Sequence, residues 1–345
     1  MFRHTILTII KTMKKLLLLI YFFSVSLMAN ELPELGSSSD TIFSSADEDK
    51  ISKQILYQVN KNPLVVNDIE VDDYLGNLGR RLLTGTSIAS RDIKFFILND
   101  STINAFATLG GVIGVHTGLF LAANSESELA SVLGHEIAHI SQKHLPRIIA
   151  KQKRDSYKTT LALAFALLVS RSNPDLAAAT STAANASAVQ NTLDFTRKHE
   201  QEADREGIKI LDRAGFDVRA SIDFFKTMQK GNQFSQGAAP AFLRTHPITS
   251  DRISDIQNRL SEYPYKQRMD SDNFYYVKGK IKAFLEQKKT IIKILETNIK
   301  NKSYINEAGE RFALTYAYLR SNMIIKARNE LENIKKKKDT QSNAA

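Results

Sequence analysis

Apolar positions change their spacing along the chain, and each change marks a predicted element. Residues 93–98 form a compact run with strand composition, and two shorter runs of the same kind follow at 105–108 and 112–116. In residues 129–140 the apolar side chains recur every three or four positions, as on one face of a helix. Residues 47–83 read as two further helices. The pattern predicts an α+β protein, mainly helical, with a small sheet beside one amphipathic helix.

The amphipathic helix has a start signal and one interrupting glycine. Ser125 is followed three residues later by Glu128, which is the spacing of a capping box. Gly134 costs about 1 kcal/mol of helix propensity relative to alanine, and close approach of another backbone would explain its presence. His135 and His139 follow. Because four residues make about one helical turn, both imidazoles are expected on one face.

The five residues His135-Glu136-Ile137-Ala138-His139 predict a metal site. Two imidazoles on one face can bind the same ion, and Glu136, ~100° further round the helix, can reach a water on that ion rather than the ion itself. Two histidines with one carboxylate suit Zn²⁺ and leave a fourth position for water, which predicts one zinc per chain and hydrolysis of a peptide bond. The alternative is a polar helix face or a satisfied pair of core histidines.

A charged stretch at residues 199–207 can supply the third ligand. Glu200 and Asp204 are four apart and share one helix face. We predict that Glu200 binds the metal and that Asp204 accepts a hydrogen bond from the far nitrogen of a ligating histidine. Alone, this stretch would fit an ordinary solvated helix, and the histidine pair upstream favours the metal site. Three further histidines are interpreted as structural: His116, His199 and His144. His144 lies near enough to the motif to stay open as a minor member of the site.

A third segment brings one more histidine and one arginine. Pro247 restricts His246 to an extended backbone, and Thr249 or Ser250 can cap the helix that follows. Two roles are open to His246: a fourth metal ligand that replaces water and closes the site, or a hydrogen-bond donor to the oxyanion of the tetrahedral intermediate. Arg252 is the better oxyanion candidate because its charge is permanent. A plain turn is the alternative. Our hypothesis is that His246 restrains activity.

The strand expected at 112–116 comes directly before the metal helix. An extended peptide could pair with an exposed edge of this strand, so that main-chain hydrogen bonds would bind substrates without demanding a sequence. Such recognition suits unfolded or misassembled chains. A wholly internal hairpin is the alternative. The substrate-binding residues expected on this basis are Val112, Ile113, Gly114 and Val115.

The first 29 residues read as a secretory signal peptide. Lys14 and Lys15 precede the apolar run 16–23, and small residues follow up to Ala29, after which we place the cleavage. The apolar run is short for a membrane span of ~20 residues. The absence of cysteine leaves neither a lipid-attachment site nor a disulfide framework. The sequence therefore predicts export to the periplasm.

Composition fits a folded enzyme with a basic end. Apolar residues make up 43% of the chain and charged residues 24%, with a formal net charge of +10, which is ordinary for a globular protein. The basic block 335–338 has no interleaved aromatic residues, so nucleic-acid binding is not expected. Residues 152–191 read as core helices or, alternatively, as a lid over the cleft.

The C-terminal part has helical spacing throughout. Leu314, Tyr318, Ala327 and Leu331 recur at the distances of a tetratricopeptide unit. One such unit cannot bury its apolar face alone, so it should pack against the preceding helix and the protease body. The expected organisation is a signal peptide at 1–29, a flexible lead at 30–45, a zinc metallopeptidase domain at 46–265, a TPR-like helical segment at 273–336 and a disordered tail at 337–345.

The two ligand motifs together resemble the gluzincin metallopeptidases, in which HExxH is followed by ExxAD. The match to the Oma-type family extends over roughly residues 52–263 and includes its periplasmic members with helical repeats. This resemblance implies a zincin-like domain with His135, His139 and Glu200 as zinc ligands and Glu136 as general base. The residues that carry it outside the ligand motifs are Asn104-Ala105-Phe106-Ala107, Gly110-Gly111, Gly118-Leu119 and Glu128-Leu129-Ala130.

The same resemblance implies the substrates and partners. It points to misfolded or misassembled periplasmic and outer-membrane proteins as substrates, and to the outer-membrane assembly machinery as a partner. The repeat segment, residues 273–336, is shorter than in those family members, which weakens any inference about docking. The alternative function is a chaperone or assembly factor for outer-membrane proteins whose protease activity stays latent.

Overall fold

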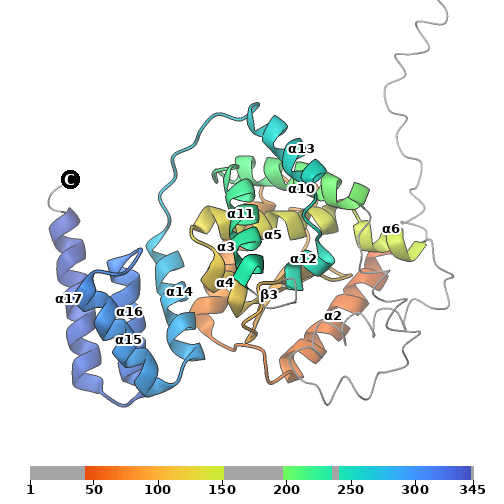
Figure 1. Cartoon of the computed structure of the whole chain (residues 1–345). Helices are drawn as coiled ribbons and strands as arrows, with labels where there is room; N and C mark the ends of the chain where they lie inside the picture. The colour runs from red at the N-terminus through yellow and green to blue at the C-terminus, as the bar shows by residue number, and fades with distance from the viewer. Residues whose placement is uncertain (1–42, 151–196, 235–240, 343–345) are drawn as a thin grey trace, which may run out of the picture. The chain divides into compact units, whose positions relative to one another are not determined.

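The computed structural model describes residues 43–150, 197–234 and 241–342 (Figure 1). The expected signal peptide, most of the flexible lead and the connection at 152–191 lie outside these residues. Sixteen elements are described: α2 Ser45–Lys61, α3 Ile69–Leu83, β1 Lys94–Leu98, β2 Ala105–Ala107, β3 Val112–His116, α4 Thr117–Ala122, α5 Glu126–Ser141, α6 His144–Ala150, α10 Arg197–Arg213, α11 Ala220–Phe234, α12 Ala241–Thr245, α13 Ser250–Leu260, α14 Asp272–Leu285, α15 Lys288–Asn301, α16 Glu307–Arg320 and α17 Ile324–Ser342.

The described chain is mostly helical with one small mixed sheet, which agrees with the expected class. The three predicted strands form within a residue or two of their expected bounds. The two helices predicted in residues 47–83 are α2 and α3. Within the described residues, no helix combines the length and apolar character needed to cross a membrane.

The sheet has the strand order β1-β3-β2, with β1 parallel and β2 antiparallel to β3. Strand β3 is therefore central, and all five of its residues are buried. Because both of its edges already carry ladder hydrogen bonds, no further peptide can pair with it. The expectation that Val112, Ile113, Gly114 and Val115 bind substrate is wrong. It assumed an exposed strand, whereas β3 lies between its two neighbours.

In the described part of the chain, β2 is the outer strand of the sheet on this side. Asn104 accepts a hydrogen bond from the N–H of His116, and the N–H of Thr108 donates to the carbonyl of Val112. Hydrogen-bonded and non-hydrogen-bonded pairs alternate along an antiparallel ladder. The backbone groups of Ala105 and Ala107 therefore point away from β3, toward the outer edge.

Helix α5 runs through the core and contacts α3, α10, α11 and β2 (Figure 1). Every residue from Glu126 to Ile140 is buried. Ser125 caps the helix by accepting from the N–H of Glu128 at 3.1 Å, as predicted. The second bond of a capping box does not form, because the Glu128 carboxylate instead accepts from the N–H of Asn124 at 2.9 Å.

Helix α10 approaches α5 closely beside the glycine at position 134. A Cβ on Gly134 would lie 3.5 Å from the carbonyl oxygen of Gly207, and a Cβ on Gly207 would lie 3.3 Å from the backbone nitrogen of His135. The two helices thus cross backbone to backbone beside the first predicted ligand. The backbone expected near Gly134 is present, but a Cβ on Gly134 would be in ordinary van der Waals contact with it, and the tighter fit is at Gly207.

The C-terminal helices build a second small core. Helix α16 contacts α14, α15 and α17, and α14 also contacts α3 and α4. Gly279 and Gly309 allow the closest approach, since a Cβ on Gly279 would lie 2.5 Å from the Gly309 carbonyl oxygen. Of the four residues expected at repeat positions, three are buried in this core: Leu314, Tyr318 and Ala327. Leu331 is 37% exposed, and assignment of a TPR-like unit stays a prediction.

Candidate metal centre

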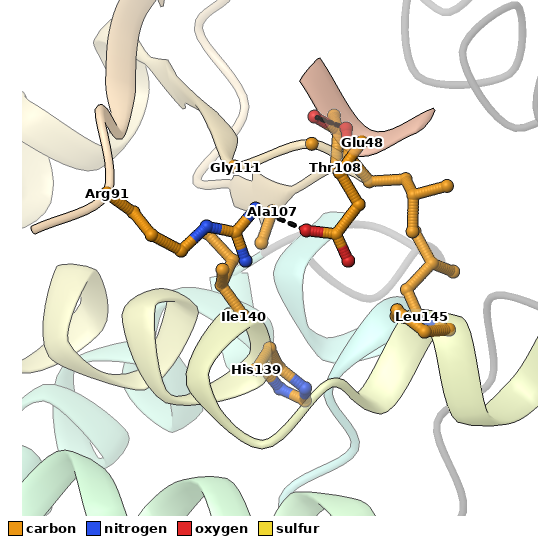
Figure 2. A pocket seen from close by; sticks show the side chains of 11 residues that line it. Glu48, Arg91, Ala107, Thr108, Gly111, His139, Ile140 and Leu145 are labelled. Atoms are coloured by element: carbon orange, nitrogen blue, oxygen red, sulfur yellow. Dashed lines mark hydrogen bonds and ion pairs between the residues drawn. The ribbon is translucent and has the colours of Figure 1, made fainter. Parts of the chain in front are cut away.

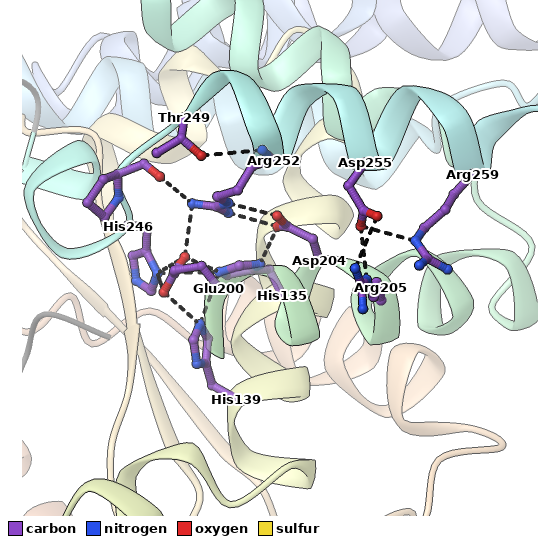
Figure 3. A network of polar contacts seen from close by, with 11 residues as sticks. His135, His139, Glu200, Asp204, Arg205, His246, Thr249, Arg252, Asp255 and Arg259 are labelled. Atoms are coloured by element: carbon purple, nitrogen blue, oxygen red, sulfur yellow. Dashed lines mark hydrogen bonds and ion pairs between the residues drawn. The ribbon is translucent and has the colours of Figure 1, made fainter. Parts of the chain in front are cut away.

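Helices α5 and α10 bring the three predicted ligands together (Figure 3). His135 and His139 lie one turn apart on α5, with their Nε2 atoms 3.0 Å apart. Glu200, in the first turn of α10, places its carboxylate oxygens 3.3 Å from Nε2 of His135 and 3.5 Å from Nε2 of His139. All three side chains are buried.

His246 completes the cluster from the end of α12. Its Nδ1 lies 3.3 Å from Nε2 of His135 and 3.1 Å from Oε1 of Glu200. Among the described residues, four side chains each offer one ligand atom, and these atoms all lie within 4.8 Å of one another: His135, His139, Glu200 and His246. Of the two roles left open for His246, the position of Nδ1 favours the fourth ligand. His246 is held there by stacking on Phe242, with ring centroids 4.6 Å apart.

The spacing of the four ligand atoms fits zinc. Bonds of ~2.0–2.1 Å in a tetrahedral site put neighbouring ligand atoms about 3.4 Å apart. Five contacts among these four side chains, counting either oxygen of Glu200, have lengths of 3.0 to 3.5 Å, close to this value, and one ligand atom from each side chain lies within 4.8 Å of the others. Three imidazoles and one carboxylate are also a borderline-soft donor set, which suits zinc better than the all-oxygen cations calcium or magnesium.

The buried charges also call for a divalent cation. Glu136, Glu200 and Asp204 are three buried carboxylates, and within the part of the chain that the structure describes, the buried guanidinium of Arg252 contacts Glu200 and Asp204. If all are ionised, two negative charges remain uncompensated in a region where unpaired charge is costly. One divalent ion held by the four ligand atoms would balance them.

Asp204 lies behind the first ligand, as predicted. Its Oδ1 is 3.1 Å from Nδ1 of His135, so the far nitrogen of that ring faces a carboxylate. Burial alone would raise the pKa of Asp204, but the charge and hydrogen bonds of Arg252 outweigh burial and keep this pKa below its usual value. An ionised Asp204 fixes the tautomer in which Nε2 of His135 is free to bind metal.

Arg252 occupies a different place from the one expected. Only 1% of its surface is exposed. Nε and Nη2 each donate to Asp204 at 2.7 Å, and Nη1 donates to the carbonyl of Pro247 at 2.8 Å and lies 2.9 Å from Oε2 of Glu200. We therefore correct the expectation that Arg252 stabilises the oxyanion. The donors of its guanidinium already contact Asp204, Glu200 and the Pro247 carbonyl. Arg252 therefore orients the two carboxylates.

Glu136 lies beside the cluster rather than in it. It is 1% exposed, and burial raises the pKa of its carboxyl, an effect opposed by the charges of His246 and His135 and by a backbone hydrogen bond from Ala107 on β2. Nε2 of His246 lies 3.4 Å from Oε1 of Glu136, although the two atoms do not meet hydrogen-bond geometry. The predicted general base thus stands between the candidate fourth ligand and the free edge of β2.

A small pocket opens next to the ligands (Figure 2). Its volume is about 20 Å³, enough for roughly one water molecule. It extends from His139 along Ala107 and Thr108 to the ion pair formed by Glu48 and Arg91. A peptide would need far more room than this pocket provides.

Sequence reasoning left one neighbour of the ligands undecided. His144, at the start of α6, places its Nδ1 2.8 Å from Nδ1 of His139. His199 stacks on His144, with ring centroids 4.7 Å apart. His116 belongs to another group of contacts, with Nδ1 2.8 Å from the hydroxyl of Thr102. Only the spacing of His144, five residues after His139, could have indicated its position.

Comparison with known proteins adds an independent finding. The model of peptidase family M48 matches residues 71–260. The chain is 39% identical to a putative beta-barrel assembly-enhancing protease of Vibrio cholerae over 234 residues, which cover 68% of this chain and 48% of that protein. It is 32% identical to the beta-barrel assembly-enhancing protease of Escherichia coli K12 over 252 residues, which cover 73% of this chain and 52% of that protein.

More distant relatives also match. The mitochondrial metalloendopeptidase OMA1 of Schizosaccharomyces pombe is 29% identical over 213 residues, which cover 62% of this chain and 60% of that protein. The chain thus spans about half the length of the bacterial relatives it matches. The matched region of the family model contains both ligand motifs and the segment with His246.

Proposed function

Because the chain belongs to peptidase family M48, we propose that it is a zinc-dependent endopeptidase that cleaves misfolded or misassembled proteins of the periplasm and outer membrane. One observation carries the proposal: the cluster of His135, His139 and Glu200 has the spacing of zinc ligands, and the carboxylate of Glu136 lies beside it. The substrate class rests on the names of the bacterial relatives, of which the chain spans about half the length.

The proposed mechanism assigns one task to each residue. His135, His139 and Glu200 would hold one Zn²⁺, which supplies Lewis acidity toward the scissile carbonyl and the attacking water when bound. Glu136 takes the proton from that water and delivers it to the leaving amine. The raised pKa of the buried Glu136 carboxyl suits a group that must hold a proton between these two transfers.

The edge of β2 is the proposed place for substrate. An extended chain that pairs with the outward backbone groups of Ala105 and with the carbonyl of Ala107, whose N–H already donates to Glu136, would gain main-chain hydrogen bonds without a sequence requirement. Ala107 is also the residue whose backbone hydrogen bond reaches Glu136. Pairing at this edge would therefore bring a peptide bond next to the proposed base.

The test uses Glu136→Gln, with Glu206→Gln as the matched control. Glu206 lies on the outer side of α10, where it pairs with Lys209 at 3.1 Å. Zinc content and casein digestion are measured with and without a chelator. We expect Glu136→Gln to keep its zinc and to lose digestion, while the control keeps both. Full digestion by Glu136→Gln, or wild-type protein without zinc, would overturn the proposal.

A second candidate function has its own observation in favour. Nδ1 of His246 takes a place in the ligand cluster, and Nε2 faces Glu136 at 3.4 Å. With Nδ1 of His246 as a ligand, the position of the attacking water is taken. Nε2 of the same ring also limits the access of Glu136 to a water. The alternative is therefore a chaperone or assembly factor with latent protease activity. His246→Ala should raise casein cleavage at least severalfold if the closed site is the resting state, and unchanged cleavage would reject this restraint.

Location and partners complete the proposal. We infer export by the signal peptide at residues 1–29, a periplasmic location, and client contacts through the TPR-like segment at 273–336. The outer-membrane assembly machinery is the proposed partner, since two bacterial relatives are named as beta-barrel assembly-enhancing proteases. N-terminal sequencing of protein from the periplasmic fraction tests the first part, and a start other than residue 30 would move the cleavage site.

A further inference from the structure

His144 connects one metal ligand to a second carboxylate. The chain leaves α5 at Gln142, turns through Lys143 with a left-handed φ of 52°, and starts α6 at His144. This tight reversal brings His144 back against the last turn of α5. Its side chain is completely buried, and its Nδ1 lies 2.8 Å from Nδ1 of His139.

The arrangement of ring nitrogens fixes the protons. A histidine that binds metal through Nε2 carries its proton on Nδ1. His139 must then donate from Nδ1, so Nδ1 of His144 must accept and the proton of His144 sits on Nε2. That Nε2 lies 3.2 Å from Oε2 of Glu202, a carboxylate that can accept it. Nη1 of Arg147 also donates to this Oε2, at 2.9 Å.

We propose that His144 is a positioning residue that fixes the tautomer and ring orientation of His139, with Glu202 and Arg147 fixing His144 in turn. The two histidine ligands are then supported differently. His135 meets the carboxylate of Asp204 directly, at 3.1 Å, whereas His139 reaches the carboxylate of Glu202 through a second imidazole. The proposal rests on the zinc site of the proposed function and adds a residue to its support.

Packing also limits the motion of the His144 ring. His199 stacks on it with ring planes only 22° apart and centroids separated by 4.7 Å. A ring that is stacked on one face and hydrogen-bonded at both nitrogens has little freedom to rotate. Such a ring keeps its partner in one orientation. A water molecule in the same place could turn and shift.

Two substitutions separate hydrogen bonding from packing. Asparagine at position 144 places an amide oxygen close to where Nδ1 stands, so His144→Asn keeps the acceptor for His139. His144→Phe keeps an aromatic ring for His199 to stack on but offers no acceptor. His199→Phe is the matched control, because it retains a stacked ring and leaves His139 and His144 in contact. Zinc affinity is measured by competition with a chromophoric chelator at fixed pH.

We expect His144→Phe to bind zinc about 10–100-fold more weakly than wild type. His144→Asn and the control should stay within about threefold, and the unfolding midpoints of all metal-free variants should be similar. Equal affinity of His144→Phe and wild type would overturn the proposal, as would equal weakening by both substitutions at position 144. If His144→Phe does not fold, His144→Leu decides, because leucine also removes the acceptor for His139 and unchanged affinity there would overturn the proposal. A wild-type protein without zinc affinity would instead defeat the proposed function.

Discussion

Replacing Arg252 with methionine should weaken the fold and the metal site together. The substitution keeps an apolar side chain of similar length but removes four polar contacts: two to Asp204 at 2.7 Å, one to the Pro247 carbonyl at 2.8 Å and one to Glu200 at 2.9 Å. Both carboxylates would stay buried without their cation. This is the situation in which removing one partner of a buried ion pair is most destabilising.

The expected loss is about 3–5 kcal/mol of unfolding free energy. With a urea m value of ~3 kcal/mol/M, the unfolding midpoint of the metal-loaded protein should fall by about 1–2 M. Zinc affinity should fall as well, by roughly 10–100-fold, because Glu200 and Asp204 lose the group that orients them. Adding Asp204→Asn to Arg252→Met should restore part of the stability, since one uncompensated charge is then gone.

The chain contains a matched control for this experiment. Arg205, on the same helix as Asp204, donates to Asp255 from Nε at 3.0 Å and from Nη2 at 3.1 Å, the same two-pronged geometry on the surface. An exposed pair contributes only about 0–1 kcal/mol, so Arg205→Met should barely move the urea midpoint. If the two substitutions shift the midpoint equally, burial does not govern these pairs and the charge balance of the site is wrong.

Three further outcomes are expected. Removing zinc with a chelator should lower the calorimetric midpoint, by the equivalent of about 4 kcal/mol when free zinc was 1,000-fold above its dissociation constant; an unchanged midpoint would mean no bound metal. Gly207→Ala, whose Cβ would lie 3.3 Å from the His135 nitrogen, should reduce zinc affinity severalfold in the same competition assay, whereas Gly134→Ala, at 3.5 Å, should cost less. Burial lowers the pKa of Lys278 to about 8 from 10.5, so the folded state releases this proton at a lower pH than the unfolded state does. From pH 8 to pH 10 the wild type should therefore gain unfolding free energy relative to Lys278→Met, by at most about 3 kcal/mol. Parallel urea midpoints of the two proteins across that range would contradict this expectation.

Local geometry explains what the sequence predicts well. His135 and His139 are four residues apart on one helix, so covalent geometry alone puts them on one face. The same rule relates Glu200 to Asp204. The glycine at position 134 is informative because it is unfavourable in a helix unless something needs the space. The structure places the carbonyl of Gly207 beside it, although the position that a Cβ would crowd more is Gly207 itself.

Tertiary geometry explains what the sequence could not give. Strand β3 follows β2 closely along the chain, yet its position between β1 and β2 depends on where the long-range parallel partner settles. No local pattern in Val112–Val115 shows whether the strand is central or at an edge, because an apolar segment of this length fits either position. Arg252 was likewise expected at the oxyanion from its charge alone, whereas the need of Asp204 and Glu200 for a cation determines where it lies.

The four candidate ligands come from elements of two kinds. His135 and His139 sit on a fully buried helix, and Glu200 sits on a helix that crosses it backbone to backbone. His246 follows α12, a helix of five residues, and its contacts include ring stacking on Phe242 and a backbone hydrogen bond to the same residue at 2.7 Å. If His246 is the fourth ligand, as proposed, its replacement by water would open one position while the other three ligands stay in place. Activation by that route would be a change in the segment around α12 rather than the assembly of a new metal site.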